Sequence, residues 1–378
     1  MDLSYNETQL MFRDSLRRFF SDCYDFEKRQ KILLSGEGWS REVWRALADD
    51  LGVLGACFEE GQGGLGFGAV ETAIIMEEIG RVLALEPYLP TVVLCGGILR
   101  RVGGPVADKA IEALIAGNSI CAFAHAERQA RYDIANVAVT ASREGGGYVL
   151  NGQKVLTLAA PIADRLIVSA HTNGAQTSQG GISLFMLDPC GDGIDMRSYK
   201  TVDGGRAADI SFENVTVDED ARLGEEGAAL ETIEAAIDEA VAGLCAEAAG
   251  AMRVMYESSV EFVKERRQFG RSISDFQAIQ HRIADMLIEV EQADAAALQA
   301  VLQLSAPPQE RKRAVSSAKA LINEAARFVA HNAIQLHGAI GTTDELALGH
   351  YFKRLTAIET LFGSTDHHLR RYDQNTVQ

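Results

Sequence analysis

The chain has 378 residues, of which 47% are hydrophobic and 24% charged, a composition typical of globular proteins that excludes disordered and fibrous classes. Its 36 Lys and Arg residues against 53 Asp and Glu residues give a net charge of -17, which disfavours nucleic acid and anionic membrane surfaces as partners. A length above about 250 to 300 residues predicts more than one sub-domain.

The sequence lacks the motifs of several other classes. MDLSYNETQL has no basic segment followed by an apolar run, so no signal peptide is expected, and no stretch approaches the roughly 18 apolar residues of a membrane span. The six cysteines are scattered without a CxxC pair, which indicates reduced, mostly buried thiols in the cytoplasm. No HExxH motif accompanies the eight histidines, so no metal site is expected, and no GxSxG elbow is present.

Residues 6 to about 117 are predicted to be helical. Apolar residues recur at the spacing of one buried helical face: Val70, Ala73, Ile74, Met76, Ile79 and Val82. Just before them, Gly61–Gly66 matches GxGxxG, the fingerprint of a dinucleotide-binding turn. That motif needs a preceding strand and a parallel sheet, and its surroundings here are helical, so a glycine-rich connecting loop is preferred.

From about residue 118 the pattern changes to short runs separated by glycines. Four runs rich in β-branched residues predict antiparallel strands at 148–158, 164–170, 181–187 and 208–217. Asn151-Gly152 is interpreted as a turn signal of the kind found in hairpins. This stretch is therefore expected to be an antiparallel β block.

From about residue 226 the chain is predicted to be helical again. Apolar residues keep the helical period over seven turns, and Pro307-Pro308 is expected to end that helix; the residues are Phe276, Ile279, Ile283, Met286, Leu287, Val290, Ala297 and Val301. The order is helices, then a β block, then a helical bundle, which differs from the βαβ alternation of a doubly wound sheet.

Two segments in the second helical region are candidates for a ligand site. Arg266 lies where one long helix ends and the next begins, and a guanidinium beside a helix start suits a phosphate. On spacing alone, an interhelical turn with a solvated arginine explains the same residues. Downstream, the run Gln335–Gly341 ends another helix, and its glycines are either a C-cap or a bare backbone against which a ligand lies.

Taken together, these segments resemble the acyl-CoA dehydrogenase family, flavoproteins that desaturate acyl-CoA thioesters. The matching segments are EEGQGGLGFG, LNGQK, DISFENV with RLGEEG, ERRQFG with DFQAIQH, and QLHGAIG. Within the family the chain is most similar to small subunits of pimeloyl-CoA dehydrogenases, through EPYLPTVVLCGGILR, CAEAAGAM and GHYFKRLTAIETLFGSTDHHLRR. The likeness covers essentially the whole chain.

The resemblance implies the family's fold, which is α+β and mostly α. We expect an N-terminal helical domain at 1–117, a middle antiparallel β domain at 118–222 and a C-terminal helical bundle at 223–378. It also implies FAD held between subunits. The residues expected to hold a neighbouring chain's adenine and pyrophosphate are Arg266, Gln268, Phe269, Gln335, His337 and Gly338.

The flavin ring is expected against the β domain, at Ala126 and Leu158. The family places threonines at these two positions, so this chain can offer only backbone groups there. The family's catalytic glutamate occupies one of two positions, which fall here on Ala240 and Phe362, and neither can accept a proton. Glu239 is adjacent to the first, but one helical step turns a side chain by about 100°, so we expect a salt-bridging surface residue rather than a base.

The leading expectation is the small subunit of a heteromeric, FAD-dependent acyl-CoA dehydrogenase, cytoplasmic, without catalytic residues of its own. Its expected partners are an acyl-CoA, a larger homologous subunit in a heterotetramer or further copies in a homo-oligomer, and an electron-transferring flavoprotein. The alternatives are a self-sufficient homo-oligomeric dehydrogenase and a flavin-free structural partner.

Overall fold

The computed structural model describes residues 5–343 and 345–376, which form two compact units. Unit 1 comprises the chain up to Gln30, Ala69–Ala84 and the chain from Val241 onward; unit 2 comprises Lys31–Gly68 and Leu85–Ala240. The division between them falls inside one long helix, α7 (Leu230–Glu265).

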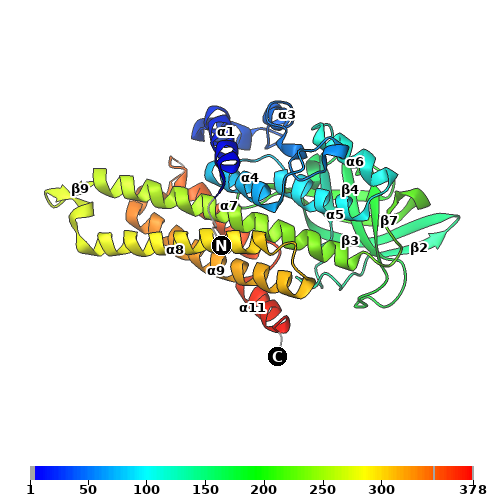
Figure 1. Cartoon of the computed structure of the whole chain (residues 1–378). Helices are drawn as coiled ribbons and strands as arrows, with labels where there is room; N and C mark the ends of the chain where they lie inside the picture. The colour runs from blue at the N-terminus through cyan, green and yellow to red at the C-terminus, as the bar shows by residue number, and fades with distance from the viewer. Residues whose placement is uncertain (1–4, 344, 377–378) are drawn as a thin grey trace. The chain divides into compact units, whose positions relative to one another are not determined.

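Unit 1 is helical apart from one short hairpin (Figure 1). Its elements, besides its parts of α7 and of α2 (Phe26–Leu34), are α1 (Glu7–Cys23), α4 (Ala69–Val82), β9 (Arg267–Gln268), β10 (Arg271–Ser272), η6 (Ile273–Asp275), α8 (Gln277–Leu302), α9 (Pro308–His337), η7 (Gly338–Thr342), α10 (Leu348–Thr360) and α11 (Thr365–Gln374). The predicted helical face of α4 is largely confirmed, since Ala73, Ile74, Met76 and Ile79 are buried.

Helices α4 and α7 cross at two glycines. A Cβ on Gly80 would overlap the carbonyl oxygen of Glu247, and a Cβ on Gly250 would overlap that of Glu77. Glycine is required at both positions because each helix presses its backbone against the other. Close to this crossing, Arg354 holds the buried Glu247 carboxylate through two hydrogen bonds of 2.6 and 2.8 Å.

The predicted helix at 276–301 is present as α8, with Met286, Val290, Ala297 and Val301 buried. The role given to the prolines was wrong. Helix α8 ends at Leu302, whereas Pro308 occupies the first position of α9. A proline is well tolerated there, because the first N–H groups of a helix have no partner within it.

Unit 2 combines helices with one mixed β-sheet (Figure 1). Its helical elements are α3 (Arg41–Asp49), η1 (Val53–Gly55), η2 (Glu60–Gln62), η3 (Leu89–Cys95, a π-helix), α5 (Gly96–Val102), α6 (Pro105–Ile115), η4 (Ala160–Ile162) and η5 (Glu219–Ala221). Its strands are β1 (Cys121–Ala124), β2 (Thr140–Glu144), β3 (Gly147–Leu158), β4 (Arg165–His171), β5 (Ile182–Leu187), β6 (Ile194–Lys200), β7 (Arg206–Asp218) and β8 (Arg222–Leu223).

The sheet is not wholly antiparallel, which corrects the expectation for the β block. The strand order is β6-β7-β3-β2-β4-β5-β8, and β1 pairs with β4 in parallel over four residue pairs. A parallel bridge also joins β2 to β4 at Thr140 and His171. The chain from β1 to β4 includes a long connection, β2 and β3, so it can return to β4 in the same direction.

The interpretation of Asn151-Gly152 as a turn was wrong. Both residues lie inside β3, where the register against β7 shifts between Leu150 and Gly152 and Gly152 has φ 133°. The hairpin turn between β2 and β3 is instead Gly145-Gly146, with φ values of 57° and 91°. Two successive positive φ values match the two-residue turns that fit strand twist.

The GxGxxG segment begins within the short η2 and continues as a loop before α4, so the expected connecting segment is present. The helical elements α3 and η1 precede it, and the first strand in the described residues is β1. A Cβ at Gly64 would collide with the backbone of Phe58 and Gly55, so glycine serves close chain packing here.

The structure also bears on membrane-spanning helices and on the state of the cysteines. None of the helices in the described part of the chain is long and apolar enough to cross a membrane. None of the six cysteines, all of which lie in the described residues, forms a disulfide; Cys95, Cys121 and Cys245 are buried, whereas Cys190 is exposed.

Candidate functional site

The predicted ring-contact residues lie in unit 2, where Ala126 follows β1 and Leu158 ends β3. The backbone N–H of Val155 donates to the carbonyl oxygen of Ala126 at 2.8 Å, which places the two segments side by side. Both Ala126 and Leu158 are half-buried. The structure therefore brings the two segments together, and neither side chain can donate a hydrogen bond to a ligand.

A β-bulge shapes the end of β3. The register against β7 shifts between Lys154 and Thr157, and Leu156 adopts φ 49°, which is rare for a bulky side chain. The Leu156 side chain is 42% exposed, and its backbone N–H donates to Asp209 Oδ1 at 3.2 Å. The bulge turns Leu156 outward while Lys154 and Thr157 stay buried. Strained backbone of this kind is common at ligand-binding sites.

A fully buried ion pair lies beneath these two segments. Lys154 Nζ donates to Glu127 Oε1 at 2.7 Å, to Ser169 Oγ at 2.9 Å and to the carbonyl oxygen of His125 at 3.2 Å. The side chains of Lys154 and Glu127 are 0% and 2% exposed. All three ammonium hydrogens therefore have acceptors, as a buried charge requires.

The Glu127 carboxylate is satisfied by further donors. It accepts hydrogen bonds from the backbone N–H groups of Ala138 at 2.7 Å and Val139 at 3.2 Å, and from Gln129 Nε2 at 2.7 Å. Burial alone would raise the pKa of Glu127, but the charge and hydrogen bond of Lys154, with the other donors, hold it below its usual value. Burial lowers the pKa of Lys154 to about 8, so the pair is ionised at neutral pH.

The sequence analysis did not predict the Lys154–Glu127 pair, although the LNGQK segment contains Lys154. Lys154 stands within an apolar strand that predicts a buried face, and a lysine at such a position needs an anionic partner. The identity of that partner, 27 residues earlier, depends on how β3 packs beside the end of β1.

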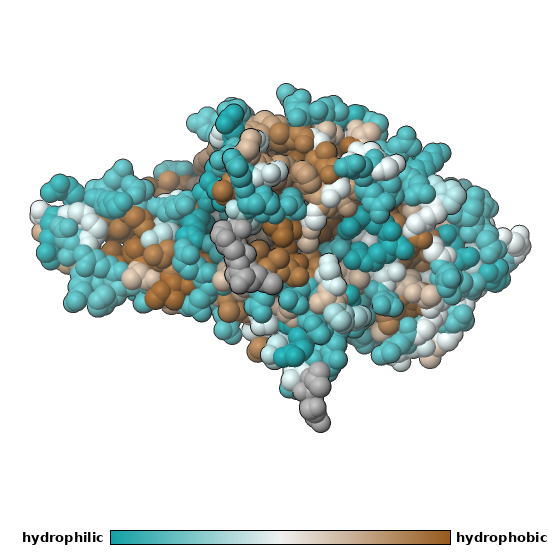
Figure 2. All heavy atoms as spheres, viewed as in Figure 1, coloured by the Kyte–Doolittle hydropathy of each residue, from teal (hydrophilic) through white to brown (hydrophobic). Residues whose placement is uncertain are grey.

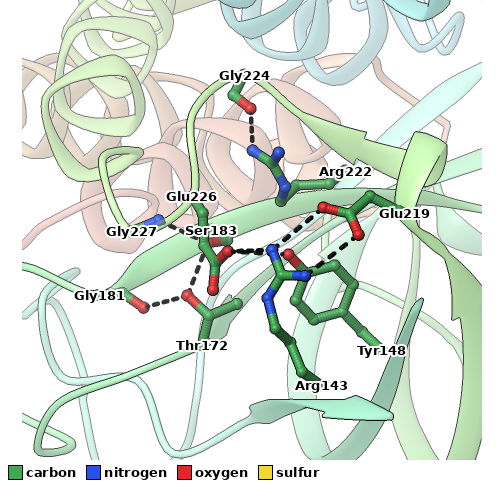
Figure 3. A network of polar contacts seen from close by, with 10 residues as sticks. All are labelled: Arg143, Tyr148, Thr172, Gly181, Ser183, Glu219, Arg222, Gly224, Glu226 and Gly227. Atoms are coloured by element: carbon green, nitrogen blue, oxygen red, sulfur yellow. Dashed lines mark hydrogen bonds and ion pairs between the residues drawn. The ribbon is translucent and has the colours of Figure 1, made fainter. Parts of the chain in front are cut away.

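A second polar network joins the end of β2 and the start of β3 to η5 and the segment that follows β8 (Figure 3). Arg143 donates to Glu219 at 3.1 and 3.2 Å and to Glu226 at 2.6 Å, and the Tyr148 hydroxyl donates to Glu226 at 3.1 Å. Beside it, the backbone N–H of Gly227 donates to Ser183 Oγ at 2.8 Å. No predicted site residue takes part, so the network is assigned to holding the chain after β7 against the sheet.

The predicted phosphate-binding segment lies at one end of unit 1, at the hairpin formed by β9 and β10 (Figure 1). We call residues 266–272 the tip hairpin. Arg266 and Gln268 are exposed, and Phe269 is 90% exposed with φ 55°. Within the described residues, the Arg266 guanidinium has neither a hydrogen bond nor an ion pair, so it is available to an external anion.

The other three predicted residues lie at the C-terminal end of α9. Gln335 and Gly338 are exposed, and Gly338 ends the helix with φ 66° and no atom within 4 Å of where a Cβ would stand. His337 is half-buried, and its Nδ1 lies 2.9 Å from the carbonyl oxygen of Ala333. This end of α9 therefore presents bare backbone beside one partly enclosed imidazole.

An aromatic stack joins these two segments. The rings of Phe262 and His337 lie 4.2 Å apart at 26°, and Phe262 is in the last turn of α7. The backbone N–H of Arg266 donates to the carbonyl oxygen of Phe262 at 2.9 Å. The structure thus brings the two predicted nucleotide-binding segments together within unit 1.

Neither family position for a catalytic glutamate carries a carboxylate. Ala240 is fully buried on α7, and Phe362 is half-buried with φ 56° between α10 and α11. Glu239 pairs with Arg100 at 2.9 Å and with Arg101 at 2.7 Å, as a salt-bridging role predicts. The surface location expected for it was wrong, because its side chain is only 17% exposed.

The residues of the tip hairpin and of the C-terminal end of α9 fit the nucleotide end of FAD. The Arg266 guanidinium suits a pyrophosphate, Gly338 offers backbone without a side chain, and the exposed Phe269 can contact an aromatic base. The residues in unit 2 fit the ring less fully, because Ala126 and Leu158 can contribute only backbone groups and apolar contact. No group of side chains in the described residues could hold a metal ion.

Matches to known domains cover nearly the whole chain. Residues 6–132, 122–215 and 230–375 match, respectively, the N-terminal, middle and C-terminal domains of acyl-CoA dehydrogenases. The chain belongs to the acyl-CoA dehydrogenase family, whose members are FAD-binding oxidoreductases. This result confirms the predicted family, fold class, enzyme class and cofactor class.

Three similar proteins illustrate the family. The chain is 29% identical to the Caffeyl-CoA reductase-Etf complex subunit CarC of Acetobacterium woodii, over 90% of each chain. The structure titled "FAD complex of PigA" has a TM-score of 0.91 and 28% identity, covering 99% of this chain and 98% of that one. A chain of the ChsE4-ChsE5 complex from Mycobacterium tuberculosis has a TM-score of 0.89 and 25% identity, with coverage of 99% and 98%.

Proposed function

We propose that this chain is the small subunit of a heteromeric, FAD-dependent acyl-CoA dehydrogenase whose catalytic carboxylate is supplied by a larger homologous partner. The observation that carries the proposal is that Ala240 and Phe362, at the two positions where the family has its catalytic glutamate, lack a carboxylate. Abstraction of a thioester α-proton needs a base within hydrogen-bond reach. The nearest substitute in sequence, Glu239, has its two carboxylate oxygens occupied by Arg100 at 2.9 Å and Arg101 at 2.7 Å.

Each group of site residues has one task in this proposal. FAD, when bound, accepts the substrate β-hydrogen as hydride. Arg266, Gln268 and Phe269, with Gln335, His337 and Gly338, bind and orient the nucleotide end of a neighbouring chain's cofactor. Ala126 and Leu158 present backbone to a flavin ring, and the buried Lys154–Glu127 pair below them fixes that backbone.

Apolar side chains near the tip hairpin support an assembled protein. Figure 2 shows such side chains gathered over the part of α8 beside the hairpin. Ile279, Ile283 and Leu287 of α8 are only half-buried, and Ile288 is 55% exposed. Exposed apolar side chains gathered in one place are typical of contact surfaces. We propose a heterotetramer with the larger subunit in preference to a homo-oligomer, because Ala240 and Phe362 leave this chain without a base.

The relatives support the remaining assignments. One is a subunit of a complex with Etf, which favours an electron-transferring flavoprotein as acceptor. Another is a chain of a two-component complex, which favours a heteromer. By its likeness to pimeloyl-CoA dehydrogenase small subunits, we propose a dicarboxylyl or other bulky acyl-CoA as substrate. The domain division 1–117, 118–222 and 223–378 and the cytoplasmic location stay predictions.

Flavin stoichiometry tests this proposal. We expect one FAD per pair of unlike subunits, because this chain keeps the residues that hold a neighbour's nucleotide and lacks side-chain donors for its own ring. The measurement is flavin absorbance against protein mass on the complex co-purified with its larger subunit. One FAD per chain would contradict this asymmetry, and a complex without flavin would favour a structural partner.

Arg266→Ala is expected to weaken FAD retention by about 10- to 150-fold, the equivalent of losing a charge-assisted hydrogen bond of roughly 1.5 to 3 kcal/mol. Turnover per bound flavin should stay nearly unchanged, since the pyrophosphate contact is equally strong in the ground and transition states. Arg266→Lys should recover only part, because an ammonium lacks the planar fork.

The measurement is FAD dissociation from the assembled protein, with size-exclusion chromatography alongside. Lys264→Ala is a suitable control, since this exposed lysine two residues earlier forms its ion pair, within the described part of the chain, with Glu261 on its own helix. Full flavin content in Arg266→Ala, together with loss of assembly, would show that Arg266 is an intersubunit salt-bridge residue.

A further inference from the structure

The tip hairpin has little core of its own. Its strands are two residues each, and residues 266–271 are all exposed. Such a hairpin is not stable by itself, so its direction depends on what holds its ends. Its position matters because it carries Arg266 and Phe269.

Two sets of contacts tie the hairpin to the ends of α7 and α8. Ser272 Oγ lies 2.8 Å from the carbonyl oxygen of Val263 and 2.9 Å from that of Lys264, near the last turn of α7. On the α8 side, the Arg271 guanidinium lies 4.0 Å from the centre of the Phe276 ring, and the Phe269 and Phe276 rings form a T-shaped pair with their centres 6.0 Å apart. These contacts hold the hairpin against the end of α7. The end of α7 in turn needs a contact with another helix.

The Phe262–His337 stack supplies that connection. The ring of Phe262 meets His337 on α9, while the carbonyl oxygen of Phe262 accepts the N–H of Arg266. One residue therefore contacts α9 with its side chain and the first residue of the tip hairpin with its backbone.

Hydrogen-bond chemistry argues against direct phosphate binding by His337. Its Nδ1 lies 2.9 Å from the Ala333 carbonyl oxygen, an acceptor, so Nδ1 carries the hydrogen. Burial lowers the pKa of His337, so the ring is neutral at pH 7 and Nε2 holds a lone pair. A phosphate oxygen is also an acceptor, so Nε2 cannot bind it.

We propose that His337 is a positioning residue whose ring, stacked on Phe262, couples the C-terminal end of α9 to the tip hairpin, and that it does not bind the cofactor through its nitrogens. The coupling follows from the contacts alone; its effect on FAD rests on the proposed function. The role assigned to His337 changes accordingly, from a polar ligand to an aromatic support of Arg266 and Phe269.

The test combines His337→Ala, His337→Phe, Phe262→Ala and the double alanine variant of the full chain. Amide hydrogen exchange of the tip hairpin should rise about 3- to 10-fold in either single alanine variant, as expected for the loss of one aromatic pair. The double variant should show little more, because the two rings act as one contact. His337→Phe should stay near wild type, since phenylalanine keeps the stack.

The chain offers a matched control on the same helix. His331 contacts the ring of Phe352 on α10 at 5.2 Å, so His331→Ala removes a histidine–phenylalanine contact that does not involve α7. It should leave exchange in the tip hairpin unchanged. FAD retention, measured on the assembled protein, should fall in His337→Ala and recover in His337→Phe.

Two results would overturn the inference. One is additive exchange effects of the two alanine substitutions, which would mean that the rings are not coupled. The other is loss of FAD in His337→Phe with a wild-type exchange pattern, which would make His337 a polar ligand. A wild-type assembly without FAD would instead refute the proposed function, while the exchange results would still decide whether the stack couples α9 to the hairpin.

Discussion

The purified chain alone is expected to dehydrogenate acyl-CoA thioesters about 10²- to 10⁴-fold more slowly than a family member with its own base, the usual effect of losing a positioned general base. The physical reason is that neither Ala240 nor Phe362 can accept the α-proton. The measurement is steady-state reduction of a dye acceptor by the FAD-supplemented chain, using a panel of acyl-CoA thioesters. Turnover at an ordinary enzyme's rate would contradict the conclusion that this chain lacks a catalytic base.

A substituted chain provides the complementary test. Phe362→Glu places a carboxylate at one of the two family positions. We expect it to raise turnover in an assembly that holds FAD, whereas Phe362→Gln, of the same shape and without a basic group, should not. Equal rates in the two variants would mean that position 362 does not face the substrate.

Lys154→Met is expected to lower the free energy of unfolding by about 3 to 5 kcal/mol, because it leaves the buried Glu127 carboxylate without its counter-charge. The double variant Lys154→Met/Glu127→Gln should recover part of this loss, since it removes both charges while a glutamine oxygen can still accept from Ala138 and Val139. Chemical denaturation with a fold-sensitive probe measures both.

The pair also predicts a pH dependence. Because the folded-state pKa of Glu127 lies below the unfolded value of about 4.3, its stabilisation is present above that value and is lost as the pH falls through the folded pKa. The double variant should lack this component of acid sensitivity. Lys109→Met, which removes an exposed lysine of α6 in the same unit, is the control and should change stability by less than about 0.5 kcal/mol. An equal loss in Lys109→Met and Lys154→Met would contradict the assignment.

Hydrophobic periodicity predicted the elements whose burial is local. The face of α4 and the period of α8 follow from apolar spacing within one helix, so a single segment contains the evidence. Strand pairing is different, because it joins residues far apart in the chain. Nothing near Asn151-Gly152 distinguishes a turn from a bulge; the pairing of β3 with β7 and the turn at Gly145-Gly146 decide it.

The residues of the candidate site also differ in whether local sequence is enough to identify them. Arg266 and Gly338 could be singled out because both lie at helix ends, where residue type and position indicate their chemistry. The positioning role of the uncharged His337 ring could not be predicted from the sequence, since it depends on a ring from α7 and on a carbonyl oxygen one turn earlier on α9. Glu239 likewise required the structure, which shows the two arginines of α5 that hold it.

The crossing of α4 and α7 at Gly80 and Gly250 has a consequence for variation within the family. Most helix pairs are spaced by side chains, and an exchange of a larger for a smaller residue on one helix can be accommodated by movement of the other. Here each helix has a glycine against the backbone of the other. The distance between the two helices is therefore set by backbone atoms, which every amino acid has. Side chains elsewhere on the two helices can drift over evolutionary time while the crossing itself stays in place, provided that neither glycine gains a single carbon atom.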